Sequence, residues 1–132
     1  MATIILLNGV GSSGKSALAK ALQSITKQPF LHVAMDDFLE MMPAKFLDHP
    51  DGLRFEPQVE QGGITTTVQT GKVAGCVLSG MRRAVAAMAG AGNNQIVDEV
   101  IFGDPINKPS APLADYRKLL EPYDLYLVGV FA

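Results

Sequence analysis

Short runs of apolar residues alternate along this chain with longer stretches in which apolar residues recur at helical spacing. The runs are almost uninterrupted by polar residues, which is typical of strands that are buried on both faces of a parallel sheet. The first of them, TIILL, ends at Asn8 and Gly9, where a turn is expected. The pattern predicts strands at residues 3–7, 30–35, 95–100 and 124–131.

The stretches between these runs predict helices. Leu18, Leu22 and Ile25 share one face of a helix over 16–25, and Pro29 prevents that helix from continuing. A longer helix is predicted over 72–91, with Gly92 at its end. Shorter helices are expected from Asp36 to just before Pro43 and over 113–121. Alternating strands and helices of this kind predict a three-layer α/β/α fold with a mainly parallel sheet.

Residues 43–71 do not follow this alternation. They contain Pro43, Pro50 and Pro57 and the pair Gly62–Gly63, and only residues 64–68 resemble a strand. We therefore expect an irregular segment here. The whole chain of 132 residues has the length of one domain, so the sequence predicts a single domain over 1–132.

Composition narrows the choice of function. With 48% apolar and 18% charged residues the chain is expected to fold, and its net charge of −2 with scattered basic residues argues against a nucleic-acid partner. A lone cysteine, Cys76, cannot form an internal disulfide. The N-terminal residues resemble no signal peptide, and no apolar run is long enough for a membrane helix. A cytoplasmic protein without a membrane partner is therefore predicted.

The turn after the first predicted strand carries the clearest chemical signal. It matches the phosphate-binding pattern GxxxxGK[ST], in which backbone amides surround phosphate oxygens, the lysine reaches the outer phosphates and the final hydroxyl is a magnesium ligand. An ordinary Gly/Ser-rich turn is the alternative, but the strand before and the helix after it are the context that the motif requires. The matching residues are Gly9, Val10, Gly11, Ser12, Ser13, Gly14, Lys15 and Ser16.

Two acidic positions follow later strands. Asp36 lies at the carboxyl end of the 30–35 run, where it could accept the proton of a substrate hydroxyl, although Asp36 or Asp37 could equally be a helix N-cap. Asp98 ends the 95–100 run and is the candidate that orients magnesium, although acidic residues at strand ends are often only loop or cap residues. We prefer Asp98 to Glu99 because it follows the apolar residues directly.

Several other side chains have a structural interpretation. His32, inside a strand, is expected to be a hydrogen-bonded core histidine rather than a ligand. Cys76 is expected to pack in the interior. The methionines at 35, 41 and 42 are expected to fill gaps in the core, with an adaptable apolar pocket next to Asp36 as the alternative. Arg82 and Arg83 are expected on the exposed face of the long helix.

The sequence resembles the chloramphenicol phosphotransferases, which are small P-loop kinases. The resemblance runs through IILLNGVGSSGKSALAKALQS, LHVAMDDFLEMMPAK, GMRRAVAAMAGAGNNQIVDEVIFGD and DLYLVGV, which together span nearly the whole chain. It implies a P-loop NTPase fold and the transfer of the γ-phosphate of ATP, with Mg²⁺, to a hydroxyl of a small molecule. It also implies that residues 9–16 bind ATP, that Asp36 is the catalytic base and that Asp98 lies by the metal.

The family continues past the fourth strand into an arginine-bearing lid, another helix and a further strand, whereas the last arginine here is Arg117. The resemblance therefore implies that the C-terminal lid and last strand are missing, and leaves open whether the 132 residues are active alone. The alternatives are a kinase for another hydroxylated metabolite, a nucleotide-binding module or remnant without catalysis, and an interaction protein. Neither a homo-oligomer nor a preference between ATP and GTP is decided by the residues.

Overall fold

The computed structural model describes residues 1–9, 14–47, 49–60, 63–100 and 111–130. By its internal contacts the chain divides into two compact units. The first unit consists of Met1–Met35 together with Met81–Ala132, and the second is Asp36–Gly80. The units share the long helix α3 (Lys72–Gly90), which passes from the second unit into the first.

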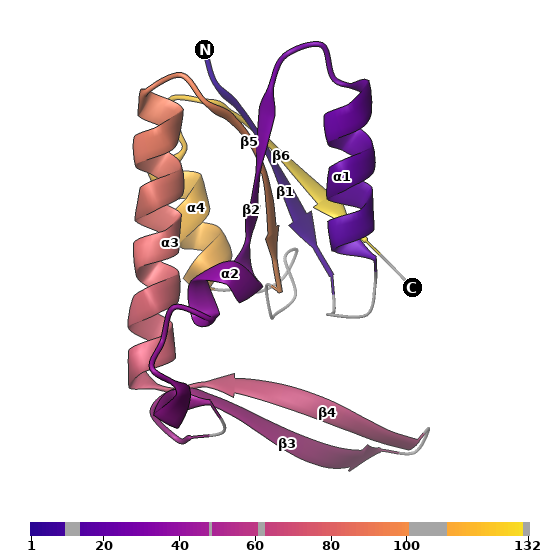
Figure 1. The fold of residues 1–132 in the computed structure, drawn as a ribbon, viewed down its shortest axis with the longest axis vertical. Coiled ribbons are helices and arrows are strands. Elements are labelled where there is room, and N and C mark those ends of the chain that lie inside the picture. Colours follow the sequence, from indigo (N-terminus) through magenta and orange to yellow (C-terminus); the bar gives the residue numbers. More distant parts are fainter. Residues whose placement is uncertain (10–13, 48, 61–62, 101–110, 131–132) are drawn as a thin grey trace. The chain divides into compact units, whose positions relative to one another are not determined.

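The first unit is built on a sheet of four parallel strands in the order β2-β5-β1-β6 (Figure 1). Because β5 lies between β1 and β2, residues far apart in sequence end side by side, and Asp98 is opposite both Leu7 and Ala34. Because all four strands are parallel, their carboxyl ends lie at the same edge of the sheet. The strands are β1 (Thr3–Asn8), β2 (Phe30–Ala34), β5 (Asn94–Glu99) and β6 (Asp124–Gly129).

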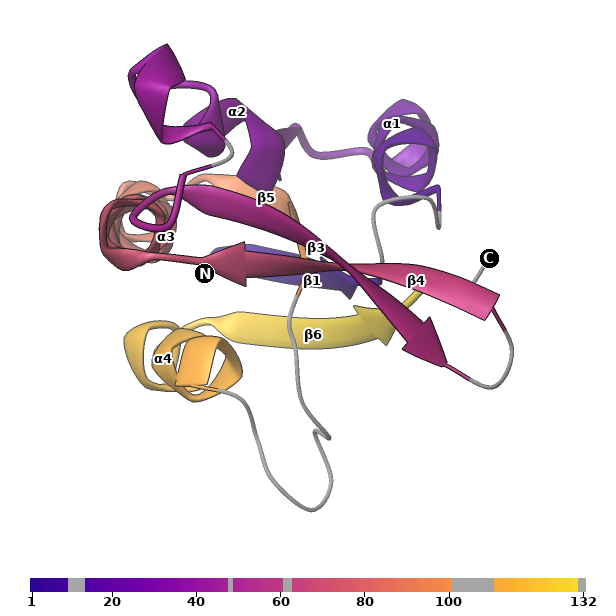
Figure 2. The same ribbon diagram turned by 90° about the horizontal axis from the view of Figure 1, so that it is seen from below.

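Helices cover both faces of this sheet. α1 (Lys15–Ile25) lies on one face, and α4 (Ala111–Leu119) lies on the other beside the part of α3 that begins at Met81 (Figure 2). On the α1 side, Leu7, Ala19 and Ile96 form a fully buried cluster. On the opposite side, the Gln95 amide donates a hydrogen bond to the Val85 carbonyl and so attaches α3 to β5. The predicted three-layer α/β arrangement is confirmed.

The predicted elements agree with the observed ones to within about two residues at most ends, with few exceptions. Met35, predicted as the end of a strand, is instead the first residue of α2 (Met35–Leu39). Gly92 ends α3 as expected: it has a φ of +97°, and the amides of Gly92 and Asn93 donate to the carbonyls of Ala89 and Met88. A left-handed φ of this kind favours glycine.

The second unit corrects the prediction for residues 43–71. A short 3-10 helix (Ala44–Phe46) precedes a two-stranded antiparallel ribbon of β3 (Leu53–Glu60) and β4 (Gly63–Thr70). Only 64–68 had been expected to be extended, because Pro57 argued against a strand at β3. Both strands of a two-stranded ribbon are edge strands, so a residue without an N–H donor is tolerated opposite Thr66.

Two glycines close the base of this ribbon. The Gly71 amide donates to the Gly52 carbonyl at 2.7 Å. A Cβ atom on Gly52 would lie 1.9 Å from the Phe46 carbonyl oxygen, and one on Gly71 would lie 2.0 Å from that of Pro50. Both positions therefore require glycine because of close backbone packing.

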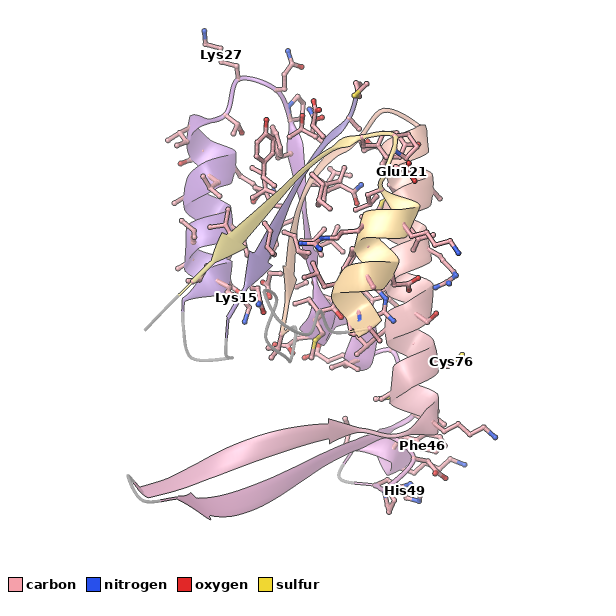
Figure 3. All side chains as sticks on the ribbon, turned by 180° about the vertical axis from the view of Figure 1, so that it is seen from behind. Lys15, Lys27, Phe46, His49, Cys76 and Glu121 are labelled. Carbon is pink, nitrogen blue, oxygen red and sulfur yellow. The ribbon has the colours of Figure 1, made fainter. Side chains whose placement is uncertain are left out.

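Four side chains with structural predictions have mixed outcomes. Met35 and Met42 are buried as expected, whereas Met41 is exposed. Cys76 was expected in the interior, but it lies on an exposed position of α3, so that prediction is wrong (Figure 3). Its helical position faces away from Ala74 and Leu78, which are the buried neighbours.

Among the helices of the described ranges, none is both long enough and apolar enough to cross a membrane.

Candidate functional site

The junction between β1 and α1 is the first part of the candidate site. Gly14 has a φ of +88° and occupies the N-cap position of α1, and its carbonyl accepts a hydrogen bond from the Leu18 amide. Within the ranges that the structure describes, no side-chain hydrogen bond caps this position, and the first turn of α1 holds no acidic residue. The positive end of an 11-residue helix is thus directed to the carboxyl edge of the sheet. The candidate phosphate-binding residues Val10, Gly11, Ser12 and Ser13 lie outside the described residues.

Lys15 is the first residue of α1 and is buried, with 5% of its surface exposed. Its Nζ atom donates a hydrogen bond to the carbonyl of Gly9, the first residue of the motif. Lysine is rarely buried in proteins, and a cation at a helix N-terminus is electrostatically unfavourable. A buried ammonium group in this position is therefore suited to a negatively charged ligand.

Ser16 and Asp98 meet although 82 residues separate them in sequence. The Ser16 hydroxyl donates a hydrogen bond to Asp98 Oδ2 at 3.2 Å. Asp98 is brought there by its place near the end of β5, between β1 and β2, and it is 8% exposed. The structure thus brings together the end of the glycine-rich motif and the acidic strand end that were predicted separately.

His32 on β2 is a third member of this group. Its Nε2 atom lies 3.0 Å from the same oxygen, Asp98 Oδ2, and 18% of the imidazole side chain is exposed. The expected hydrogen bond of His32 is therefore present, but its partner is the candidate metal residue Asp98, which the residues around His32 do not indicate. The alternation of side chains along β2 and β5 could have placed both on the α1 face, had the strand order been known.

Glu99 points to the opposite face of the sheet and has different partners. The Tyr116 hydroxyl on α4 donates to Glu99 Oε2, and Arg82 Nη1 lies 3.4 Å from Glu99 Oε1. Burial raises the pKa of Glu99, while the Tyr116 hydrogen bond and the charge of Arg82 oppose this rise. Burial and the Glu99 charge also raise the pKa of Tyr116. Glu99 therefore belongs to a structural network and not to the group around Asp98.

Arg82 extends this network to Asp115, which its Nε atom contacts at 2.8 Å. The prediction that Arg82 lies on an exposed helix face is wrong, since only 11% of its side chain is exposed. The reason is that α4, which carries both Asp115 and Tyr116, packs beside α3 on this face of the sheet. Arg83 is more exposed, at 56%, and also contacts Asp115. The hydrogen bond from Arg82 is the main reason that the pKa of Asp115 lies below its usual value.

Asp36 and Asp37 are exposed residues of α2. The helix begins at Met35, so both carboxylates lie within its first turn and neither occupies the N-cap position that was the alternative. Negative charge is favourable in a first helical turn. Asp36 belongs to the second unit, whereas Lys15, Ser16, His32 and Asp98 belong to the first.

The donor set indicates how a cation would be held. Within the described part of the chain, no group of three or more His, Cys, Asp or Glu side chains is arranged to bind a metal. One serine hydroxyl and one carboxylate, however, are the kind of incomplete ligand set that Mg²⁺ uses when substrate phosphates supply further oxygens. The residues present therefore fit a divalent cation that takes further oxygen ligands from a bound phosphate group better than they fit a resident metal.

The parallel four-stranded sheet with helices on both faces defines the class of α/β proteins. The chain belongs to the chloramphenicol phosphotransferase-like family, whose model matches residues 2–132. A protein of Mycobacterium tuberculosis that is named "Putative O-phosphotransferase" is 30% identical over 132 residues. This match covers 96% of the present chain and 56% of the relative, so the chain spans about half the length of the curated relatives that it matches.

Two solved structures share the fold. A chain in the structure of the Pnkp1/Rnl/Hen1 complex superimposes with a TM-score of 0.62 and 16% identity, over 99% of this chain and 36% of that chain. A sugar kinase from Janibacter sp. HTCC2649 superimposes with a TM-score of 0.59 and 17% identity, over 98% and 60% respectively. At such identities the similarity concerns the fold.

Proposed function

We propose that this protein is an ATP-dependent phosphotransferase that moves the γ-phosphate of ATP to a hydroxyl of a small molecule. We further propose that residues 1–132 belong to one kinase domain and that the preferred acceptor resembles chloramphenicol. The observation that carries the proposal is the hydrogen bond between Ser16 and Asp98 beside the buried Lys15. It joins a helix N-terminus, a cation and a carboxylate at one edge of the sheet, which is where α/β folds bind ligands.

The phosphate groups are assigned to residues 9–16. The amides at the start of α1 would donate to phosphate oxygens, and Lys15 would exchange its bond to the Gly9 carbonyl for a bond to an outer phosphate. Gly14 supports this role because its left-handed conformation is accessible to few other residues. Val10, Gly11, Ser12 and Ser13 are assigned to the same loop on their sequence alone.

Mg²⁺ is assigned to Ser16 and Asp98. When bound with the nucleotide, the ion neutralises charge on the phosphates during transfer. The Ser16 hydroxyl donates a hydrogen bond to Asp98, and this leaves the lone pairs of the hydroxyl oxygen available to a cation. The same hydrogen bond holds the Asp98 carboxylate at the site.

Asp36 is assigned the role of general base. Its carboxylate would accept the proton of the acceptor hydroxyl as the hydroxyl oxygen bonds to the γ-phosphorus and the bond between that phosphorus and ADP breaks. The exposure of Asp36 in the first turn of α2 is compatible with access by a substrate. Residues 43–71 are assigned to acceptor recognition, because they depart most from the regular strand–helix pattern.

Nucleotide binding is the first test. Calorimetry with ATP·Mg²⁺ should show binding that Lys15→Ala weakens at least ~10-fold, because the substitution removes a buried positive charge at the phosphate site. Lys20→Ala is the matched control, since Lys20 lies on the same helix and is exposed. Equal affinity of the Lys15→Ala and Lys20→Ala variants would contradict the proposal.

Turnover is the second test. ATP consumption should be measured against a panel of hydroxylated antibiotics, chloramphenicol among them, and hydroxylated metabolites. Asp36→Asn should lower turnover by ~100-fold or more, while Asp37→Asn, one residue along the same helix, should leave it nearly unchanged. Equal losses in both variants would remove Asp36 from the chemistry. Tight nucleotide binding without turnover on any acceptor would favour a non-catalytic nucleotide-binding module instead.

A further inference from the structure

We propose that His32 is a positioning residue that fixes the Asp98 carboxylate and thereby sets the affinity of the site for the divalent cation of the nucleotide complex. This inference rests on the proposed function, because it assumes that Asp98 and Ser16 face that cation. It assigns to a histidine of β2 a role in metal binding through another residue, without direct contact with the metal.

The geometry around Asp98 Oδ2 carries the inference. This one oxygen lies 3.2 Å from the Ser16 hydroxyl and 3.0 Å from His32 Nε2. An ionised carboxylate only accepts hydrogen bonds, so both neighbours must donate to it. The imidazole therefore carries a proton on Nε2. With two donors on one oxygen, the carboxylate is held in one rotamer and one orientation.

The backbone explains why these three groups meet. Ala34 pairs with Asp98 and His32 pairs with Ile96, so the side chains of His32 and Asp98 lie on the same face of adjacent strands, two positions apart. Ser16 reaches the same oxygen from the first turn of α1. A side chain at the end of a strand would otherwise have several rotamers available, and holding it in one costs conformational entropy.

A restrained carboxylate favours cation binding in two ways. The entropy of ordering Asp98 is lost during folding and is not lost again when the ion binds. The hydrogen bond from Ser16 also keeps the hydroxyl proton directed towards Asp98. The lone pairs of the hydroxyl oxygen then remain available to the cation. Residues that orient metal ligands in this manner commonly change metal affinity by ~10- to 100-fold when they are replaced.

The test measures how Mg²⁺ changes nucleotide affinity. ADP binding to the full 132-residue chain should be followed by calorimetry with Mg²⁺ and with EDTA, for the unaltered chain and for His32→Leu. The leucine variant should lose ~10-fold or more of the affinity gained with Mg²⁺, while its affinity for ADP in EDTA should stay within ~2-fold. A merely structural role would lower both affinities together or neither, and either result would overturn the inference.

Two polar variants keep the test valid if His32→Leu does not fold. In His32→Gln the amide nitrogen is three bonds from Cβ, as is Nε2 of histidine, so this variant should retain most of the Mg²⁺ effect. In His32→Asn the amide nitrogen is one bond closer to the backbone and should not reach Asp98, so the effect should be lost. Equal Mg²⁺ effects in the two variants would overturn the inference.

A spectroscopic measurement adds a readout that is independent of binding. The chain has two histidines, His32 and His49, and ¹⁵N NMR of the imidazoles distinguishes a proton on Nε2 from one on Nδ1. We expect the Nε2–H form for His32 and a change in its Nε2 signal in Asp98→Asn, with the His49 signals as an internal reference. A proton on Nδ1 alone, or a His32 signal that Asp98→Asn does not alter, would overturn the inference.

The outcomes separate this inference from the proposed function. If the unaltered chain binds no nucleotide, both fail. If Lys15→Ala abolishes nucleotide binding while His32→Leu keeps the full Mg²⁺ effect, the phosphotransferase site stands and the role of His32 is rejected.

Discussion

The hydroxyl of Tyr116 on α4 donates a hydrogen bond to the carboxylate of Glu99 at the end of β5, and both side chains are almost completely buried. Tyr116→Phe removes this donor and leaves a buried carboxylate oxygen without it. We expect the free energy of unfolding to fall by about 1–3 kcal/mol, as measured by urea denaturation. Tyr126→Phe is the control, because the Tyr126 residue is 58% exposed, and it should change stability by no more than ~0.5 kcal/mol. Equal effects of the two substitutions would contradict this account of the network.

Glu99 should also make stability depend on pH in an identifiable direction. Because burial raises its pKa above 4.5, the folded state holds the proton to a higher pH than the unfolded state does. The contribution of Glu99 to stability is thus fully present below pH 4.5 and is lost as the pH rises through the pKa of the folded state. Asp115 contributes in the opposite sense, since its pKa is lowered, mainly by the hydrogen bond from Arg82.

The contribution of Glu99 is isolated by comparison with Glu99→Gln, whose side chain does not titrate. The difference in unfolding free energy, unaltered chain minus variant, should decrease as the pH rises above 4.5 and then become constant. Denaturation at a series of pH values measures it. A difference that is constant over the whole range, or that increases with pH, would show that the pKa of Glu99 is not raised.

The base of the β-ribbon should be sensitive to a single methyl group. Gly52→Ala places a Cβ atom 1.9 Å from the Phe46 carbonyl oxygen, so the backbone must move, and we expect a loss of about 1–3 kcal/mol. Gly80→Ala, in the middle of α3, meets nothing within 4 Å and should increase stability by about 0.5–1 kcal/mol through helix propensity. Thermal unfolding of the two variants compares them directly, and a tolerated Gly52→Ala would argue against the close packing at this base.

The Ser16 hydroxyl should matter for the cation and not for folding. Ser16→Ala removes the donor to Asp98 and should weaken ADP binding in Mg²⁺ by ~10-fold, with little effect in EDTA. Ser16→Thr keeps a hydroxyl at the same position and should retain most of the affinity. Calorimetry measures the ADP affinity of both variants in Mg²⁺. Equally weak binding by the threonine and alanine variants would mean that the Ser16 hydroxyl is not responsible for the Mg²⁺-dependent affinity.

The local pattern of apolar and polar residues was sufficient to predict much of the fold. The apolar runs that became β1, β2, β5 and β6 are continuous because a parallel sheet covered on both faces has no solvent-exposed side. Helix ends could be predicted from single residues such as Gly92, because its left-handed conformation is a local property of the residue. The β3 strand was missed because Pro57 disfavours central strands, and nothing in the local sequence shows that β3 would pair with β4 in a two-stranded ribbon.

For the candidate site, too, some features could be predicted from the sequence and others required the tertiary structure. Residues 9–16 could be predicted as a phosphate-binding loop because consecutive residues form the motif, and the prediction of Asp98 over Glu99 rests on its place after an apolar run. Only the tertiary structure decided that Ser16 and His32 share one oxygen of Asp98, and that Arg82 is enclosed between Glu99 and Asp115. These contacts depend on the strand order and on the packing of α3 and α4, which bring distant residues together. A linear pattern fixes which face of its own element a side chain occupies, whereas the neighbour across that face is fixed by the whole chain.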